Sequence, residues 1–190
     1  MKRSGVFFTI LSVIVAVSAI VTLSVTNTSI IAQVANLVTN PSFETGGTSI
    51  GQDYNQNNWT FFVIEEPVKG AVLTSGAQDG NACFEIQTND GRGFLHSDPF
   101  AVTPGSKLNV SVWAKGAGEG AVEILWWKKY DNDTVVESDH HRDALKTFTA
   151  SSSWQQISTT ASAPEDAKFA YIRLVAKKAN VSFDNVSVTK

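Results

Sequence analysis

Most of the chain consists of short runs in which apolar and polar residues alternate. Such alternation predicts strands that bury one face, and turn-forming segments such as “GAQDGN” and “TPGSK” separate one run from the next. Many short strands at this spacing indicate an all-β protein, a β-sandwich of the jelly-roll type. The runs after residue 36 read “NWTFFVIE”, “GAVLTSG”, “ACFEIQT”, “KLNVSVWAK”, “GAVEILWWKKY”, “WQQISTTAS”, “FAYIRLVAK” and “NVSFDNVSV”.

Residues 1–35 have a different pattern. After Lys2 and Arg3, an uncharged apolar run extends from Val6 to Val25, close to the roughly 20 residues that span a bilayer. The basic start holds the amino end inside the cell and sends the rest outside. We therefore expect one N-terminal hydrophobic helix, a signal peptide or a signal anchor, followed by a single domain over residues 36–190.

The domain is expected to be extracellular, and the secreted and membrane-anchored forms both remain open. Asn-x-Ser/Thr sequons are glycosylation signals in that location. They occur at Asn27, Asn58, Asn109, Asn132, Asn180 and Asn185.

Charge and motif content exclude several classes of function. The formal net charge is −3, whereas a nucleic-acid partner requires a basic patch. No carboxylates have the spacing of a glycosidase pair, and no serine, cysteine or lysine lies in a nucleophile motif. The segment “DHHRD” at residues 139–143 is expected to be a solvated loop. We therefore expect a protein that is not an enzyme and does not bind nucleic acid.

The stretch “LNVSVWAKGAGEGAVEILWW” predicts two strands that pair as a hairpin around a glycine-rich turn. Successive side chains of a strand point to opposite faces. Trp113 and Trp127 then share the outer face of the hairpin, with Glu123 between them. A slip of one residue would exchange Trp127 for Trp126. The remaining tryptophans, Trp59 and Trp154, are assigned to the core or its rim.

The order of several segments resembles the carbohydrate-binding modules of families four, nine and twenty-two, which are often attached to glycan-degrading enzymes. The segments are “NLVTNPSFETG”, Trp59, “GNACFEI”, “VTPGSKLNVSVWAKG”, “AVEILWWKKYD”, “WQQIS”, “APEDAKFAYIRL” and “VSFDNVSV”. The resemblance runs from about residue 36 to the end of the chain. It implies a jelly-roll β-sandwich that binds a polysaccharide or glycan without catalysis.

The resemblance also implies a structural calcium ion where the first and last strands approach each other. Its ligands would be Glu44 of the opening motif, Asp184 of the closing motif, and Asp79 or Asn81 in “QDGNA”. Calcium takes about six to eight oxygens, and two acids brought together repel each other without a cation. The alternative is that Glu44 and Asp184 cap strand ends or pair with a lysine.

In the family, the sugar lies on the outer face of the concave sheet. Such a site needs flat aromatic rings for the sugar faces and polar groups for the hydroxyls. Strand alternation and the family pattern select the residues that we expect to bind the glycan. They are Trp113, Trp127, Glu123, Tyr171, Arg173 and His96.

A second class of function remains open. One leader followed by one module also suits a cell-surface structural or adhesion protein, such as a filament or pilin-like subunit that self-assembles. A glycan binder exposes aromatic residues in a groove, whereas a structural subunit buries that face or exposes a strand edge for pairing. Trp113, Glu123 and Trp127 favour glycan binding, but the sequence does not name the sugar.

Overall fold

The computed structural model describes residues 34–45, 50–51, 55–56, 58–128, 130–131, 134–135 and 140–190. The predicted N-terminal hydrophobic helix therefore lies outside the described residues. In the part that is described, no helix is long and apolar enough to cross a membrane. The described residues belong to one compact unit, Gln33–Lys190.

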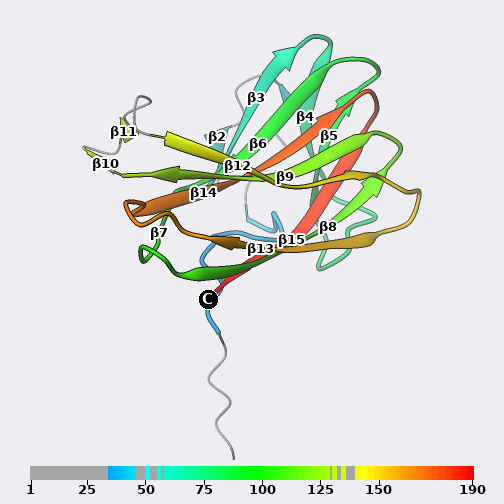
Figure 1. The fold of residues 1–190 in the computed structure, drawn as a ribbon. Coiled ribbons are helices and arrows are strands. Elements are labelled where there is room, and N and C mark those ends of the chain that lie inside the picture. Colours follow the sequence, from blue (N-terminus) through cyan, green and yellow to red (C-terminus); the bar gives the residue numbers. More distant parts are fainter. Residues whose placement is uncertain are drawn as a thin grey trace, which may run out of the picture. The chain divides into compact units, whose positions relative to one another are not determined.

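The chain folds into a sandwich of two main antiparallel sheets (Figure 1). The first, here called the β8 sheet, contains in spatial order β1 (Ile50–Gly51), β4 (Val68–Leu73), β5 (Cys83–Thr88), β15 (Val181–Thr189), β8 (Lys107–Gly116) and β13 (Gln155–Ser162). The second, the β9 sheet, contains β12 (His140–Thr149), β9 (Glu119–Trp127), β14 (Phe169–Lys177), β6 (Arg92–Ser97), β3 (Trp59–Glu65) and β2 (Asn55–Gln56), with β7 (Phe100–Ala101) paired to β14. A separate pair consists of β10 (Tyr130–Asp131) and β11 (Thr134–Val135). The prediction of an all-β sandwich is confirmed, because the described residues form strands and connections without a helix.

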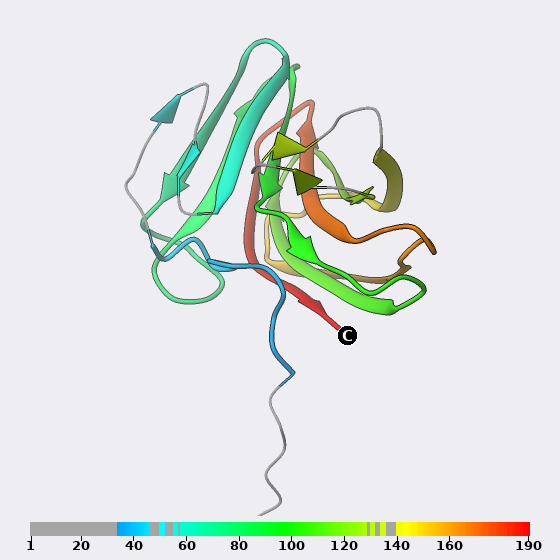
Figure 2. The same cartoon turned by 90° about the vertical axis from the view of Figure 1, so that its left-hand side faces the viewer.

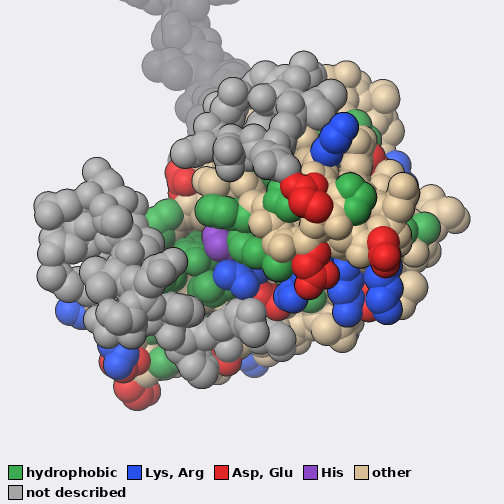
Figure 3. Space-filling view, turned by 90° about the horizontal axis from the view of Figure 1, so that it is seen from above, with side chains coloured by type: hydrophobic (Ala, Val, Ile, Leu, Met, Phe, Trp, Pro, Cys, Tyr) green, Lys and Arg blue, Asp and Glu red, His purple; other side chains and the backbone are tan. Residues whose placement is uncertain are grey.

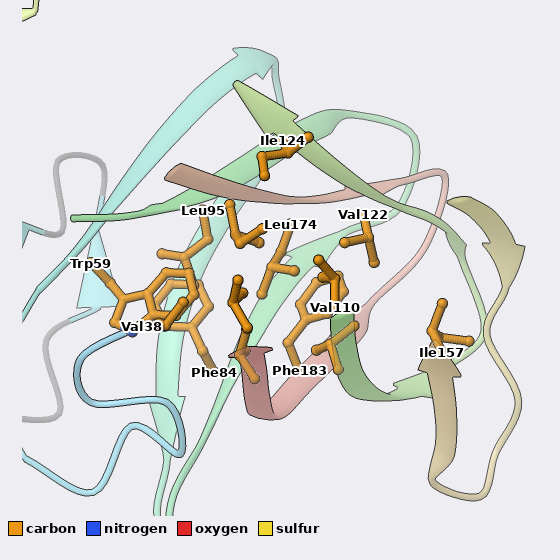
Figure 4. Packing of buried hydrophobic residues seen from close by; sticks show 14 of the residues in the cluster. Val38, Trp59, Phe84, Leu95, Val110, Val122, Ile124, Ile157, Leu174 and Phe183 are labelled. Atoms are coloured by element: carbon orange, nitrogen blue, oxygen red, sulfur yellow. The ribbon is translucent and has the colours of Figure 1, made fainter. Parts of the chain in front are cut away.

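The hydrophobic core lies between the two main sheets. Figure 4 shows Ile124 and Leu174 of the β9 sheet and Val110 and Phe183 of the β8 sheet in the space between them. Each of these side chains is at most 2% exposed, and burying apolar surface is the main force that holds such a sandwich together. Because each strand gives alternate residues to the core, the outer face of each sheet remains for other contacts.

The opening and closing segments of the domain meet along β15, as the resemblance implied. Leu37 N donates to Val188 O at 2.8 Å, and Val186 N donates to Pro41 O at 2.9 Å. Asn36 adds side-chain bonds, since its Nδ2 donates to Val186 O and its Oδ1 accepts from Val188 N. Figure 2 shows the blue start of the described chain beside the red final strand.

The prediction that β8 and β9 form a hairpin is wrong. β8 pairs with β13 and β15, whereas β9 pairs with β12 and β14 in the other sheet. The glycine-rich segment crosses between the sheets, and there Ala117 N donates to Asn180 O at 3.1 Å. Alternation does not distinguish the two arrangements, because both strands bury the same residues in a hairpin and in a crossover. The consequence is that Trp113 and Trp127 lie on opposite outer surfaces.

The expectation of a solvated loop at residues 139–143 is also wrong from His140 onward. These residues begin β12, whose backbone pairs with β9 from His140 opposite Trp127 to Thr149 opposite Glu119. β12 is an edge strand of its sheet. One side of an edge strand faces no partner strand, so a polar and charged sequence is compatible with it.

Candidate functional site

The outer face of the β9 sheet gathers the predicted glycan-binding residues apart from Trp113. The strands β6, β14 and β9 are neighbours, and their register places Arg173 opposite both His96 and Glu123. Figure 3 looks onto this face and shows hydrophobic side chains and a histidine beside basic and acidic side chains. The residues brought together are Trp127, Glu123, Tyr171, Arg173 and His96.

Arg173 is the centre of a polar row across this face. Its Nε donates to His96 Nε2 at 2.7 Å, and its Nη1 lies 3.3 Å from Glu123 Oε2. Burial, followed by the neighbouring Arg173 charge, lowers the pKa of His96 from 6.5 to about 3. His96 is therefore neutral at ordinary pH and can accept the arginine N–H through Nε2. The row holds the guanidinium and the carboxylate in fixed positions.

An aromatic row accompanies the polar one. Ring centroids lie 5.2 Å apart for Phe62 and Phe94, 4.6 Å for Phe94 and His96, 4.6 Å for His96 and Tyr171, and 5.9 Å for Tyr171 and Trp127. Such contacts each stabilise a fold by roughly 1 kcal/mol beyond the buried area. Trp127 and Tyr171 are only 4% and 8% exposed, whereas Phe62 is 41% exposed. Phe62 is therefore the ring of this row with an open surface.

A groove of about 500 Å³ continues from this row across the same face. Phe94, Val175, Ala121 and Thr147 are successive cross-strand partners, so they form one strip across four strands. The side chains of Val175 and Ala121 are small, so the surface is hollowed along this strip. Both residues line the groove. The groove is also lined by Arg92, Glu119, Gly120, Glu123, Phe148, Thr149 and Lys177.

Charged side chains border the groove on the side away from Arg173. Glu119 Oε2 lies 2.8 Å from Lys177 Nζ, and Glu119 Oε1 lies 2.6 Å from Lys178 Nζ. Hydrogen bonds from these two lysines lower the pKa of Glu119 to about 2. Arg92 lies opposite Lys177 in the register. The low strip thus runs between two polar rows, one at Glu123 and one at Glu119.

The tryptophans lie in the core, at its rim or on an outer face as alternation predicts, but Trp113 lies on the outer face of the other sheet. Trp126 is in the main core at 2% exposure, so Trp127 is the outward residue of the pair. Trp59 is buried in the core, and Trp154 is half-buried at the rim. Trp113 is half-buried on the outer face of the β8 sheet. It therefore does not share a surface with Trp127.

The predicted metal ligands Glu44 and Asp184 hold the same loop. Glu44 Oε1 accepts the backbone N–H groups of residues 81 and 82, both at 2.8 Å. Asp184 Oδ2 accepts those of residues 78 and 79 at 2.7 and 3.0 Å, and Oδ1 accepts Asn185 N–H at 2.7 Å. Burial raises the pKa of Asp184, while these backbone bonds act in the opposite direction.

This arrangement fits capping carboxylates better than a calcium cage. The donors that point at Glu44 and Asp184 are amide N–H groups, whereas calcium requires oxygen ligands. Gly80 has a φ of 64°, and a Cβ there would strike the Glu44 carboxylate, so the loop closes tightly over it. Asp79 accepts a bond from Ser42 Oγ at 3.1 Å. No group of three or more His, Cys, Asp or Glu side chains within the described ranges could hold a metal. Calcium binding stays a prediction.

Sequence reasoning missed several residues of the groove. Alternation in β3 does place Phe62 outward, since Trp59 and Phe61 are buried. Arg92, Ala121 and Val175 come close to Phe62 only through the register between strands. An alternating run of residues does not define that register.

No protein-family model and no curated protein matches the chain. Several solved structures are similar to the chain. The enzymatically active domain of bacteriophage CBA120 tailspike protein 4 matches with a TM-score of 0.58 at 15% identity, covering 81% of this chain and 21% of that one. The Clostridium thermocellum xylanase 10B CBM22-1–GH10 modules, complexed with xylohexaose, match with 0.58 at 13% identity, covering 84% and 29%. The CBM22-1 xylan-binding domain of Paenibacillus barcinonensis Xyn10C matches with 0.56 at 13% identity, covering 82% and 94%.

This chain has the fold of a carbohydrate-binding module. The resemblance drawn from the sequence is therefore confirmed at the level of the fold. The chain spans 21% and 29% of the length of the tailspike and xylanase structures, but most of the isolated xylan-binding domain.

Proposed function

We propose that this carbohydrate-binding-module fold binds a polysaccharide chain, without catalysis, in the groove on the outer face of the β9 sheet. The observation that carries the proposal is the low apolar strip of Val175 and Ala121 between two polar rows. A sugar ring presents C–H groups on its faces and hydroxyls at its edges. A strip for the faces with polar groups on both sides matches that distribution.

The residues at the groove have distinct roles in this proposal. Phe62 offers its exposed ring at one end of the strip. Glu123 accepts hydrogen bonds from sugar hydroxyls, and its bond to Arg173 fixes its position. Arg92 and Lys177 donate from the opposite side. Trp127 and Tyr171 pack beside the groove rather than in its lining, so they support the face instead of stacking on the sugar.

The same proposal places the domain outside the cell, secreted or anchored through the N-terminal segment. Its support is the sequence alone, in which the apolar run from Val6 to Val25 follows Lys2 and Arg3.

Calorimetric titration of the Gln33–Lys190 unit with neutral oligosaccharides tests the proposal. Xylohexaose is the first probe, because it is the ligand in a structurally similar protein. Ala121→Phe would fill the groove and is expected to abolish binding. Ser111→Phe adds the same bulk to the outer face of the β8 sheet and is expected to bind normally. Absence of binding to every sugar, or normal binding by Ala121→Phe, would show that the groove is not a glycan site.

A further inference from the structure

The four edge strands of the two main sheets, as far as the structure describes them, differ in how they are protected against pairing. β1 and β2 are strands of 2 residues each. β12 carries the charged residues Asp143 and Lys146, and its register shifts between Ala144 and Lys146. Short length, charge and bulges are the usual means of blocking an exposed strand edge. β13 has none of them.

β13 is a regular strand of 8 residues with the sequence QQISTTAS, which contains no charged residue and no proline. It pairs with β8 without a register shift, from Gln155 opposite Ala114 to Ser162 opposite Lys107. Ile157 and Ala161 anchor it in the core at 7% and 6% exposure. Among the described residues, no strand pairs with its other edge. Its outward backbone N–H and C=O groups therefore form a template for another strand.

We propose that β13 pairs antiparallel with β13 of a second copy of this chain, forming one continuous sheet across a two-fold dimer. A two-fold interface places the same patch of each copy against itself. Because β13 is uncharged, self-pairing brings no like charges together, whereas the charged strand β12 would do so. Serine and threonine side chains also form favourable cross-strand pairs.

The alternation of β13 limits the register of this pairing. Partner residues in a sheet lie on the same face, so an outward residue must meet an outward residue. A two-fold axis at Thr159 satisfies this condition. It pairs Ser158 with the partner subunit's Thr160 on the outer face, and Ile157 with the partner subunit's Ala161 on the core face.

A functional consequence follows, which rests on the proposed glycan site. An axis perpendicular to the extended sheet keeps equivalent faces of both copies on the same side. The two grooves of the β9 sheets then face the same polysaccharide, and simultaneous binding raises the apparent affinity without a new contact.

Sedimentation of the Gln33–Lys190 unit over a wide concentration range tests the pairing. We expect a reversible monomer–dimer equilibrium. Thr160→Lys places a charge on the exposed face of the edge strand and is expected to weaken dimerisation by about tenfold or more. Ser111→Lys places the same charge on β8, an interior strand of the same sheet, and is expected to dimerise normally. Circular dichroism checks that both variants are folded.

A cysteine cross-link tests the register independently. Thr159→Cys would lie opposite its own copy, within the separation that a disulfide spans. The native Cys83 is 1% exposed and does not compete. Thr149→Cys, exposed at the end of neighbouring β12, is the control. We expect rapid oxidation of Thr159→Cys to a covalent dimer and slow oxidation of the control. A monomer at every concentration, or equal cross-linking of the two variants, would overturn the proposal.

Discussion

Arg173 and Glu123 lie directly opposite each other across the β14–β9 pair, with 3.3 Å between Arg173 Nη1 and Glu123 Oε2. Their side chains are only 13% and 8% exposed. Most of each charged side chain is therefore withdrawn from water, and only the small exposed part of Glu123 that lines the groove can meet solvent or a ligand. A pair in this situation matters most when only one of its members is removed.

Glu123→Gln is expected to lower the free energy of unfolding by about 3 kcal/mol, because it leaves the Arg173 charge buried without its counter-charge. Urea denaturation measures the change. Glu119→Gln is the matched control, since Glu119 pairs with two lysines at an exposed position. Exposed ion pairs contribute little, so the control should change stability much less. Equal losses in the two variants would show that burial is not the cause.

Phe62→Ala tests the exposed end of the aromatic row. With 41% of its surface exposed, Phe62 contributes less to the core than to the open face. We expect a loss of glycan affinity of about tenfold, or about 1.4 kcal/mol, and a small change in melting temperature. Ile64→Ala is the control, because Ile64 is similarly exposed on the same strand and lies further along it. A loss of stability without a loss of affinity would assign Phe62 to packing alone.

The polar row predicts a pH dependence of stability. Burial and Arg173 lower the pKa of His96 to about 3 in the folded protein, whereas the unfolded value is 6.5. Between these values the unfolded chain binds a proton that the folded chain does not. The contribution of His96 to the free energy of unfolding is therefore fully present above pH 6.5 and falls by about 1.4 kcal/mol per pH unit as the pH drops from 6.5 to about 3.

His96→Gln separates this effect from the titration of carboxylates. Its amide oxygen can still accept the Arg173 N–H, but the side chain binds no proton. Urea denaturation at a series of pH values should give a shallower acid slope for the variant than for the wild type. Identical slopes would mean that His96 does not titrate between the two states.

The sequence predicted the strands and their buried faces well, because alternation directly reports which side of a strand meets the core. Leu108, Val110 and Val112 are buried on β8, and Val122 and Ile124 are buried on β9. The same pattern does not show which strands pair with each other. The crossover at Ala117 has the glycine-rich sequence of a turn, and it separates Trp113 from Trp127.

The candidate site was predicted in part for the same reason. Alternation assigned Glu123 and Arg173 outward, the family pattern selected His96, and the structure joins the three through the register of β6, β14 and β9. Burial of Trp127 depends on packing by Tyr171, which local sequence does not specify. The start of β12 was missed because an edge strand tolerates a polar sequence that resembles a loop.

The loop held by Glu44 and Asp184 gives a prediction about the closing motif. Asp184 accepts N–H groups on both carboxylate oxygens. In Asp184→Asn, whichever way the amide turns, its NH₂ group faces a backbone donor. We expect the free energy of unfolding to fall by about 2–3 kcal/mol. Asp79→Asn is the control, because Asp79 is exposed and accepts only the Ser42 hydroxyl among the described bonds.

Glu44 and Asp184 could act in this loop either as caps of backbone N–H groups or as calcium ligands, and thermal unfolding distinguishes the two roles. If amide donors satisfy Glu44 and Asp184, the melting temperature should be the same in calcium and in chelator. A ligand that binds only the folded state would instead raise it in proportion to the logarithm of its concentration. Thermal unfolding of the Gln33–Lys190 unit in both conditions measures the difference. A rise with calcium that Glu44→Gln removes would show that oxygen ligands replace the amide contacts when the ion binds, as the sequence resemblance implies.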